Sequence, residues 1–186
     1  MGSYYYFVAQ LPALVYGQEP PMDSSAFREL ARTQMSAEDG ALLEGLDLSG
    51  NPGQAPSGCD FIDAWRDWER ALRLNLARIR SQRLKREAPG DPPVVPAAAS
   101  SAAQQAAAIP DSPLEAELFL DRARWAAIEE FQGIPYFSRN TVYAYLLKLL
   151  ILERHGSFKA ETGFAEYKSL YASILERAQS GAGESK

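Results

Sequence analysis

Few residues of this chain could take part in chemistry. Its one cysteine, Cys59, cannot form an internal disulfide, and its one histidine, His155, cannot build a histidine-based metal cluster or a Cys/His zinc site. No glycine-rich loop runs into a Lys-Ser/Thr pair, as a phosphate-binding loop requires. His155 directly precedes Gly156, which is typical of a helix C-terminus, so we interpret it as a helix terminator. We interpret Cys59 as a half-buried thiol, although its place before a predicted helix start could activate it.

Carboxylate pairs are the other chemical candidates, since two acids suffice for glycosidic or proton-transfer chemistry. Asp63 and Asp67 share one helix face, and Glu115 and Asp121 do so less closely. Each lies in the first turns of a predicted helix, where acids stabilise the helix dipole. The sequence therefore predicts a protein that is not an enzyme and that needs no metal and no cofactor.

Positive charge is concentrated in one segment. The stretch Arg66–Arg86 has eight basic and two acidic residues and so carries +6, while the rest of the chain sums to −11. Its C-terminal part is either a solvated helix end or a contact surface for an acidic protein. Nucleic acid is a less favoured partner, because a chain of pI 5.0 lacks a general positive field. The predicted partner-binding residues are Arg78, Arg83, Lys85 and Arg86.

The elements that position these residues are predicted to be helices. Alanine and leucine number 50, against 15 for valine, isoleucine and threonine, which favours an all-α fold over a sheet. A long amphipathic helix is predicted from about Asp60 to Arg86 and packs against a C-terminal helical bundle. Its apolar positions are spaced by three and four residues: Phe61, Trp65, Trp68, Leu72, Leu76 and Ile79. Trp65 and Trp68 could form a stacking platform, but this spacing favours core positions.

Helix starts are indicated by capping residues. The predicted starts and extents are Asp23 or Ser24 with a helix through Ala31, Ser36 through Leu46, Ser112-Pro113-Leu114-Glu115 through Phe131, and Ser138 before a buried Val142–Leu152 stretch. The stripe of the third helix is Leu118, Trp125 and Ile128, and a last one-sided helix is predicted over Phe164–Ala178. The run Tyr4–Val8 could be strand or helix, and we favour helix.

Four parts follow along the chain. Residues 1–86 and 112–179 are helical and share one core, residues 87–111 are a flexible linker or long loop rich in proline and alanine, and residues 180–186 are a tail. The longest apolar run, Val142–Leu152, contains Lys148 and is shorter than the ~20 residues of a membrane helix. With no leader-like start, we expect a cytoplasmic protein that does not insert into a membrane.

Three stretches together carry a resemblance. They are Tyr4–Pro12, the helix Phe61–Leu72, and Pro113–Glu117 with the following Leu120–Trp125. They resemble a bacterial family of uncharacterised proteins that is encoded with V-type ATPase subunits. More distantly, the tyrosine-rich start and all-helical plan are similar to the helical funnel that seats the central rotor stalk of those ATPases on the membrane ring, which is named C in bacteria and d in eukaryotes.

The resemblance implies a non-catalytic structural, coupling or assembly subunit of a bacterial V-type rotary ATPase. The implied partners are subunits of the central stalk or the membrane ring, and the implied location is cytoplasmic, peripheral to the inner membrane through the ATPase. The family supplies no catalytic residues. The alternative is a helical adaptor that binds an acidic protein or RNA through its arginine-rich helix end.

Overall fold

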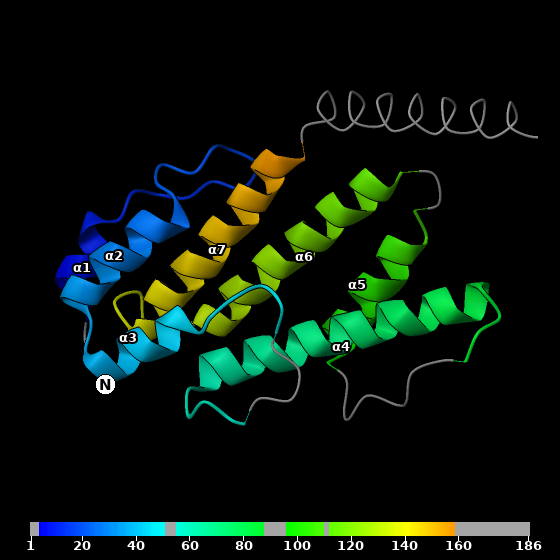
Figure 1. The fold of residues 1–186 in the computed structure, drawn as a ribbon, viewed down its shortest axis with the longest axis horizontal. Coiled ribbons are helices and arrows are strands. Elements are labelled where there is room, and N and C mark those ends of the chain that lie inside the picture. The colour runs from blue at the N-terminus through cyan, green and yellow to red at the C-terminus, as the bar shows by residue number, and fades with distance from the viewer. Residues whose placement is uncertain (1–3, 51–54, 88–95, 110–111, 159–186) are drawn as a thin grey trace, which may run out of the picture. The chain divides into compact units, whose positions relative to one another are not determined.

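A computed structural model describes residues 4–50, 55–87, 96–109 and 112–158, and the regular structure in these ranges is entirely helical (Figure 1). The helices are α1 Tyr5–Gln10, α2 Ser24–Gln34, α3 Ala37–Glu44, α4 Asp60–Arg83, α5 Ala97–Ala107, α6 Pro113–Gln132 and α7 Arg139–Ser157. The all-α prediction is confirmed, and the Tyr4–Val8 run starts a helix as favoured. The chain divides into a first compact unit, Met1–His155, and a second, Gly156–Lys186. Helices α1 to α6 and nearly all of α7 belong to the first unit.

Three predicted helix starts are confirmed by their capping bonds. In each, a side-chain oxygen accepts a hydrogen bond from the backbone N–H three residues on: Asp23 from Ala26 at 2.7 Å, Ser36 from Asp39 at 3.2 Å and Ser112 from Glu115 at 3.2 Å. These bonds satisfy N–H groups that have no partner inside the helix. The prediction for Ser138 is wrong in one respect. It directly precedes α7, but its Oγ is buried and has no hydrogen-bond partner among the described residues.

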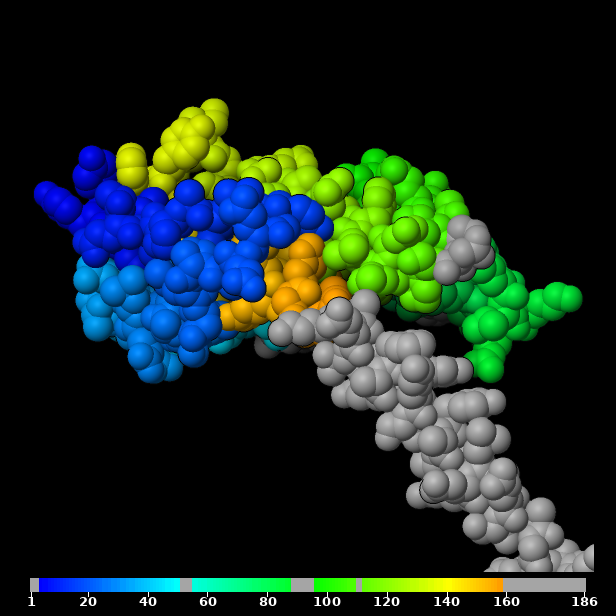
Figure 2. All heavy atoms as spheres, turned by 90° about the horizontal axis from the view of Figure 1, so that it is seen from above, coloured from blue at the N-terminus to red at the C-terminus, as the bar shows by residue number. Residues whose placement is uncertain are grey.

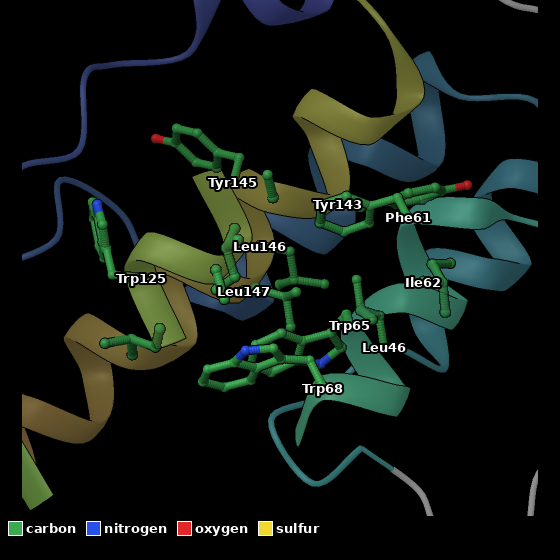
Figure 3. Packing of buried hydrophobic residues seen from close by; sticks show 14 of the residues in the cluster. Leu46, Phe61, Ile62, Trp65, Trp68, Trp125, Tyr143, Tyr145, Leu146 and Leu147 are labelled. Atoms are coloured by element: carbon green, nitrogen blue, oxygen red, sulfur yellow. The ribbon is translucent and has the colours of Figure 1, made fainter. Parts of the chain in front are cut away.

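Helix α4 supplies the aromatic part of the core. Trp65 and Trp68 are buried and stack at 6.1 Å between ring centroids, and the Trp65 indole N–H donates to the Asp47 carbonyl at 3.0 Å. Figure 3 shows both rings beside Leu146 and Leu147 of α7. Burying a side chain of this size stabilises the fold by roughly 1.5–3 kcal/mol or more. The tryptophans are therefore core residues, as their spacing predicted.

Helix α5 occupies a stretch where the sequence predicted a linker or loop. Its buried alanines recur every three or four residues: Ala99, Ala102, Ala103 and Ala106. Their small side chains let α5 pack closely along α4 (Figure 1). The expectation of a linker over 87–111 therefore fails for residues 97–107, since close backbone packing replaces the large side chains that the tract lacks. Residues 88–95 lie outside the described ranges.

Helices α6 and α7 complete the unit. The stretch Val142–Leu152 is buried except at Lys148 and Leu150, which confirms the predicted central helix, and α7 lies between α2 and α6 (Figure 1). In α6, Trp125 and Ile128 are buried, but Leu118 is exposed, so the predicted stripe is wrong at that position. Helix α6 ends at Gln132, one residue past the prediction. The helix predicted over Phe164–Ala178 lies outside the described residues.

Candidate functional site

The C-terminal end of α4 carries a group of exposed cations. We define the basic end as Arg80, Arg83, Leu84, Lys85 and Arg86, all of which are exposed. None of its four cations forms an ion pair with a residue that the structure describes. The apolar Leu84 side chain among them is 62% exposed. This surface combines exposed positive charge with an apolar side chain.

The helix ends three residues before the predicted Arg86 because the backbone turns at Lys85. Lys85 has a φ of +51°, in the left-handed region. Its N–H donates to the Gln82 carbonyl at 3.2 Å, and the Arg86 N–H donates to the Ser81 carbonyl at 2.9 Å. These two bonds form a Schellman motif, in which the left-handed position is usually glycine. Here a lysine occupies it, at a conformational cost of roughly 1 kcal/mol.

Three of the four predicted partner-binding residues come together at this surface. Arg83, Lys85 and Arg86 all belong to the basic end, whereas Arg78 is half-buried and makes contacts of its own. Arg80 was not among the predicted site residues, yet it is exposed at the same surface. Its position three residues before Arg83, on the same helix face, is the signal that identifies it.

A groove opens beside the basic end, where α4, α5 and α6 converge. Its volume is about 180 Å³, and its apolar lining includes Leu76, Ala106, Ile109 and Leu120. Arg80 and Arg83 line it as well, and Glu117 contributes one acidic side chain. The Arg83 guanidinium donates a hydrogen bond to the Ala107 carbonyl, at the end of α5. The groove therefore has an apolar floor next to a mainly cationic edge.

A buried ion network lies deeper between the same helices. Glu69 of α4 is fully buried, and Arg124 of α6 holds its two carboxylate oxygens at 2.9 and 3.0 Å. Arg73 donates to the same carboxylate at 2.7 Å, the predicted i,i+4 pair. Arg124 also contacts buried Asp121 at 3.0 Å. Planar guanidinium groups match carboxylates in this two-bond geometry, which fixes α4 against α6.

The network continues into α7. The side chain of Asp121 also pairs with Arg154 and lies 3.1 Å from the Nε2 of His155, whose ring packs against Tyr16 at 5.1 Å between centroids. Burial, followed by the charge of Arg154, lowers the pKa of His155, so this ring is neutral at pH 7. His155 is thus more than the predicted helix terminator, because it also joins α7 to α6 and to the Tyr16 segment.

The carboxylates that sequence alone pairs as acid and base have separate structural partners. Asp63 accepts from the Ser57 N–H at 2.8 Å, while Asp67 pairs with Arg70. Asp121 is buried in the ion network. Cys59 is buried. Among the described residues, no group of three or more histidine, cysteine, aspartate and glutamate side chains could hold a metal ion. The described side chains are therefore arranged for packing and surface contact.

A second exposed surface was not predicted. We define the aromatic end as Tyr5, Tyr6, Ile134, Tyr136 and Phe137, whose exposed fractions range from 41% to 85%. Tyr5 contacts Phe137 at 4.5 Å between ring centroids. Figure 2 shows the yellow segment around residues 134–137 projecting beside the blue N-terminal residues, far from the green end of α4. The only signal in the sequence is the uncharged Gly133–Phe137 run, which by itself indicates no more than a helix stop.

A hydrogen-bond junction holds the aromatic end on the core. The Tyr4 N–H donates to the Phe137 carbonyl at 2.8 Å, and the Tyr4 hydroxyl donates to Asp39 at 2.5 Å. Arg139 and the buried Tyr143 of α7 also donate to Asp39, at 3.1 and 3.3 Å. Burial alone would raise the pKa of Asp39, but the bonds from Tyr4 and Arg139 outweigh it and lower that pKa. Asp39 thus joins α1, α3 and α7 beneath the exposed rings.

The chain has no counterpart among known proteins. No protein-family model, curated protein sequence or solved structure matches it. Over the described residues, every helix is too short or too polar to cross a lipid bilayer. The function of the chain must therefore be inferred from its own residues.

Proposed function

We propose that this chain is a non-catalytic structural, coupling or assembly subunit of a bacterial V-type rotary ATPase. In this role it holds a central-stalk or membrane-ring subunit at the basic end of α4. The resemblance of Tyr4–Pro12, Phe61–Leu72 and Leu120–Trp125 to proteins encoded with such ATPases supplies the family. The all-helical unit is consistent with a part that works by its shape.

The observation that carries the proposal is the exposed positive charge of the basic end. Four cations are exposed within seven residues of a chain whose net charge is −5. Arginine donates in a fixed fork that suits carboxylates, so an acidic protein surface is the complementary partner. Charge of this kind guides association and selects the partner more than it adds affinity.

The buried network supports the mechanical part of the proposal. Glu69, Asp121 and Arg124 join α4 and α6, and Arg154 joins α7 to them. A force applied at the end of α4 would therefore reach α6 and α7 through buried ion pairs rather than through loops. Buried, fully paired charges favour one arrangement of the helices, because any slip leaves a charge without its partner.

The experiment is deletion of the gene in its host, followed by measurement of ATPase assembly and of ion transport driven by ATP. We expect a complex that is incomplete, or that hydrolyses ATP without transport. The wild-type gene restores function, and the triple variant Arg80→Glu, Lys85→Glu, Arg86→Glu does not. A matched variant with the same charge change elsewhere, Arg32→Glu, Arg66→Glu, Arg122→Glu, restores it. A fully assembled and coupled ATPase in the deletion strain would contradict the proposal.

The alternative is a helical adaptor that binds an acidic protein or RNA through the same basic end. RNA binding releases counterions, so its affinity falls steeply with salt, by a power that grows with the number of phosphates contacted. Binding of a single-stranded RNA with that salt dependence, abolished by Arg83→Glu with Arg86→Glu, would favour the adaptor. The acidic pI and the absence of aromatic side chains among the described groove residues favour the protein partner instead.

A further inference from the structure

We infer that the groove between α4, α5 and α6 receives an acidic amphipathic segment of the protein partner. One apolar side chain of that segment enters the groove, and its carboxylates bind Arg80, Lys85 and Arg86. This inference rests on the proposed function, because it assigns the chemistry of the partner to the same basic end.

The size of the groove fits one apolar side chain. Its volume is about 180 Å³, and a cavity of about 150 Å³ lined by apolar side chains is known to accommodate a benzene ring. Leu76 and Leu120 are buried in its floor, and the alanines of α5 leave the space above them open. An apolar side chain placed here would lose contact with water on most of its surface, which is the main source of affinity at such a contact.

The edge of the groove selects the charge of the segment. Arg80 lines it, and Lys85 and Arg86 follow within six residues on exposed backbone. Arg83 already donates to the Ala107 carbonyl, which holds its guanidinium at the boundary between α4 and α5 while its other N–H groups stay available. The acidic side chains near these cations are Glu117 in the groove and exposed Glu87. Four cations against two acids favour a negatively charged segment.

The backbone at Lys85 is consistent with a binding role. Glycine would adopt the left-handed conformation at no steric cost, yet the chain places a lysine there. The side chain adds a fourth exposed cation next to the groove. A strained position that keeps a charged side chain is a common feature of surfaces that bind ligands.

Nucleic acid fits the groove less well. Single strands bind to proteins through aromatic side chains on which bases stack, and the described groove lining has no aromatic residue. Glu117 would also repel a phosphate backbone. An alternating apolar and acidic protein segment uses both the floor and the edge, whereas a phosphate backbone uses the edge alone.

The test uses the full chain and a fluorescent probe peptide. The probe is a helical peptide of about 18 residues, five turns, with leucine along one face and glutamate beside it. We expect it to bind wild-type protein. The variant Arg80→Glu, Lys85→Glu, Arg86→Glu should bind about tenfold more weakly or worse, as the loss of three exposed ion pairs implies. The matched variant Arg32→Glu, Arg66→Glu, Arg122→Glu should bind as the wild type does.

A second variant separates the apolar floor from the charge. Ala116 of α6 is half-buried and lines the groove, so Ala116→Leu fills it without changing any charge. We expect this variant to bind the probe about tenfold more weakly, since the probe's leucine loses its site. A probe with alanine in place of leucine should bind wild-type protein equally weakly. Circular dichroism and thermal unfolding of each variant show that the fold is retained.

The outcomes distinguish this inference from the proposed function. Equal binding of the probe by wild-type, Ala116→Leu and triple-reversal proteins would overturn the inference, and so would tighter binding of a polyuridine strand than of the peptide. If either occurs while ATPase subunits still bind the wild-type chain, the proposed function stands without the groove. If the peptide binds as expected but no ATPase subunit does, the groove stands and the proposed function fails.

Discussion

The two exposed surfaces of the first unit are built in opposite ways. The basic end consists of neighbours in the sequence, at the terminus of one helix, and its side chains extend into solvent. The aromatic end joins residues about 130 positions apart and is fixed from below by the Asp39 junction. A surface made of charge can thus be recognised in one dimension, whereas a surface made of apolar rings is recognised only after folding.

The largest expected effect tests whether the two ends belong to one cooperative body. Arg124→Ala leaves the buried carboxylates of Glu69 and Asp121 without their main partner, so the free energy of unfolding should fall by about 3–5 kcal/mol. Arg73→Ala removes an exposed partner of the same Glu69 and should cost about 1 kcal/mol or less. Denaturant unfolding, followed by circular dichroism, measures both. Equal losses for the two variants would contradict the role assigned to the buried network.

The next effect is specific to the aromatic end. Asp39→Asn should lower the free energy of unfolding at pH 7 by roughly 1.5–3 kcal/mol, because hydrogen bonds to a charged group are lost. Since folding lowers the pKa of Asp39, its contribution is present above the ordinary value of 3.8 and is lost as the pH falls below it. The difference between variant and wild type should therefore shrink between pH 7 and pH 3. A difference independent of pH would show that the charge of Asp39 is not what stabilises the junction.

A smaller effect of opposite sign is expected at the basic end. Lys85→Gly should raise the free energy of unfolding by up to about 1 kcal/mol, because glycine adopts a positive φ without strain. Gln82→Gly, inside the helix, should lower it by a similar amount. Thermal unfolding of both variants measures the pair. If Lys85→Gly destabilises the protein as Gln82→Gly does, the left-handed turn at Lys85 is not the conformation in solution.

The smallest effect on stability is expected from the exposed rings themselves. Ile134→Ser with Tyr136→Ser should change the free energy of unfolding by about 0.5 kcal/mol or less, because both side chains lie largely in solvent. The buried counterpart Tyr143→Phe removes a hydrogen bond to Asp39 and should cost about 1 kcal/mol. The double variant should also elute earlier from a hydrophobic-interaction column. A large loss of stability would place Ile134 and Tyr136 in the core instead.

Much of the helical plan could be predicted from local physics. The capping bonds of Asp23, Ser36 and Ser112 and the buried stripe of α4 follow from short-range spacing, and the structure has them. Helix α5 could not be predicted in the same way. Alanines offer little surface to bury, so their contribution depends on how closely α4 approaches them, which the sequence does not state.

The candidate site was predictable to the extent that it is electrostatic. Arg83, Lys85 and Arg86 could be placed from charge alone, but the half-burial of Arg78 depends on how α4 packs against its neighbours. The groove requires three helices to converge, and the Glu69–Arg124 pair joins residues 55 positions apart. The predicted functional class and its ATPase partner remain proposals.

The most direct test of the proposed function is affinity capture from the host with a tagged full-length chain. Central-stalk or membrane-ring subunits of the V-type ATPase, identified by mass spectrometry, should be recovered with the wild type and with Arg32→Glu, Arg66→Glu, Arg122→Glu. Their recovery should fall about tenfold or more with Arg80→Glu, Lys85→Glu, Arg86→Glu. No ATPase subunit with the wild type, or equal recovery with all three proteins, would contradict the proposed function.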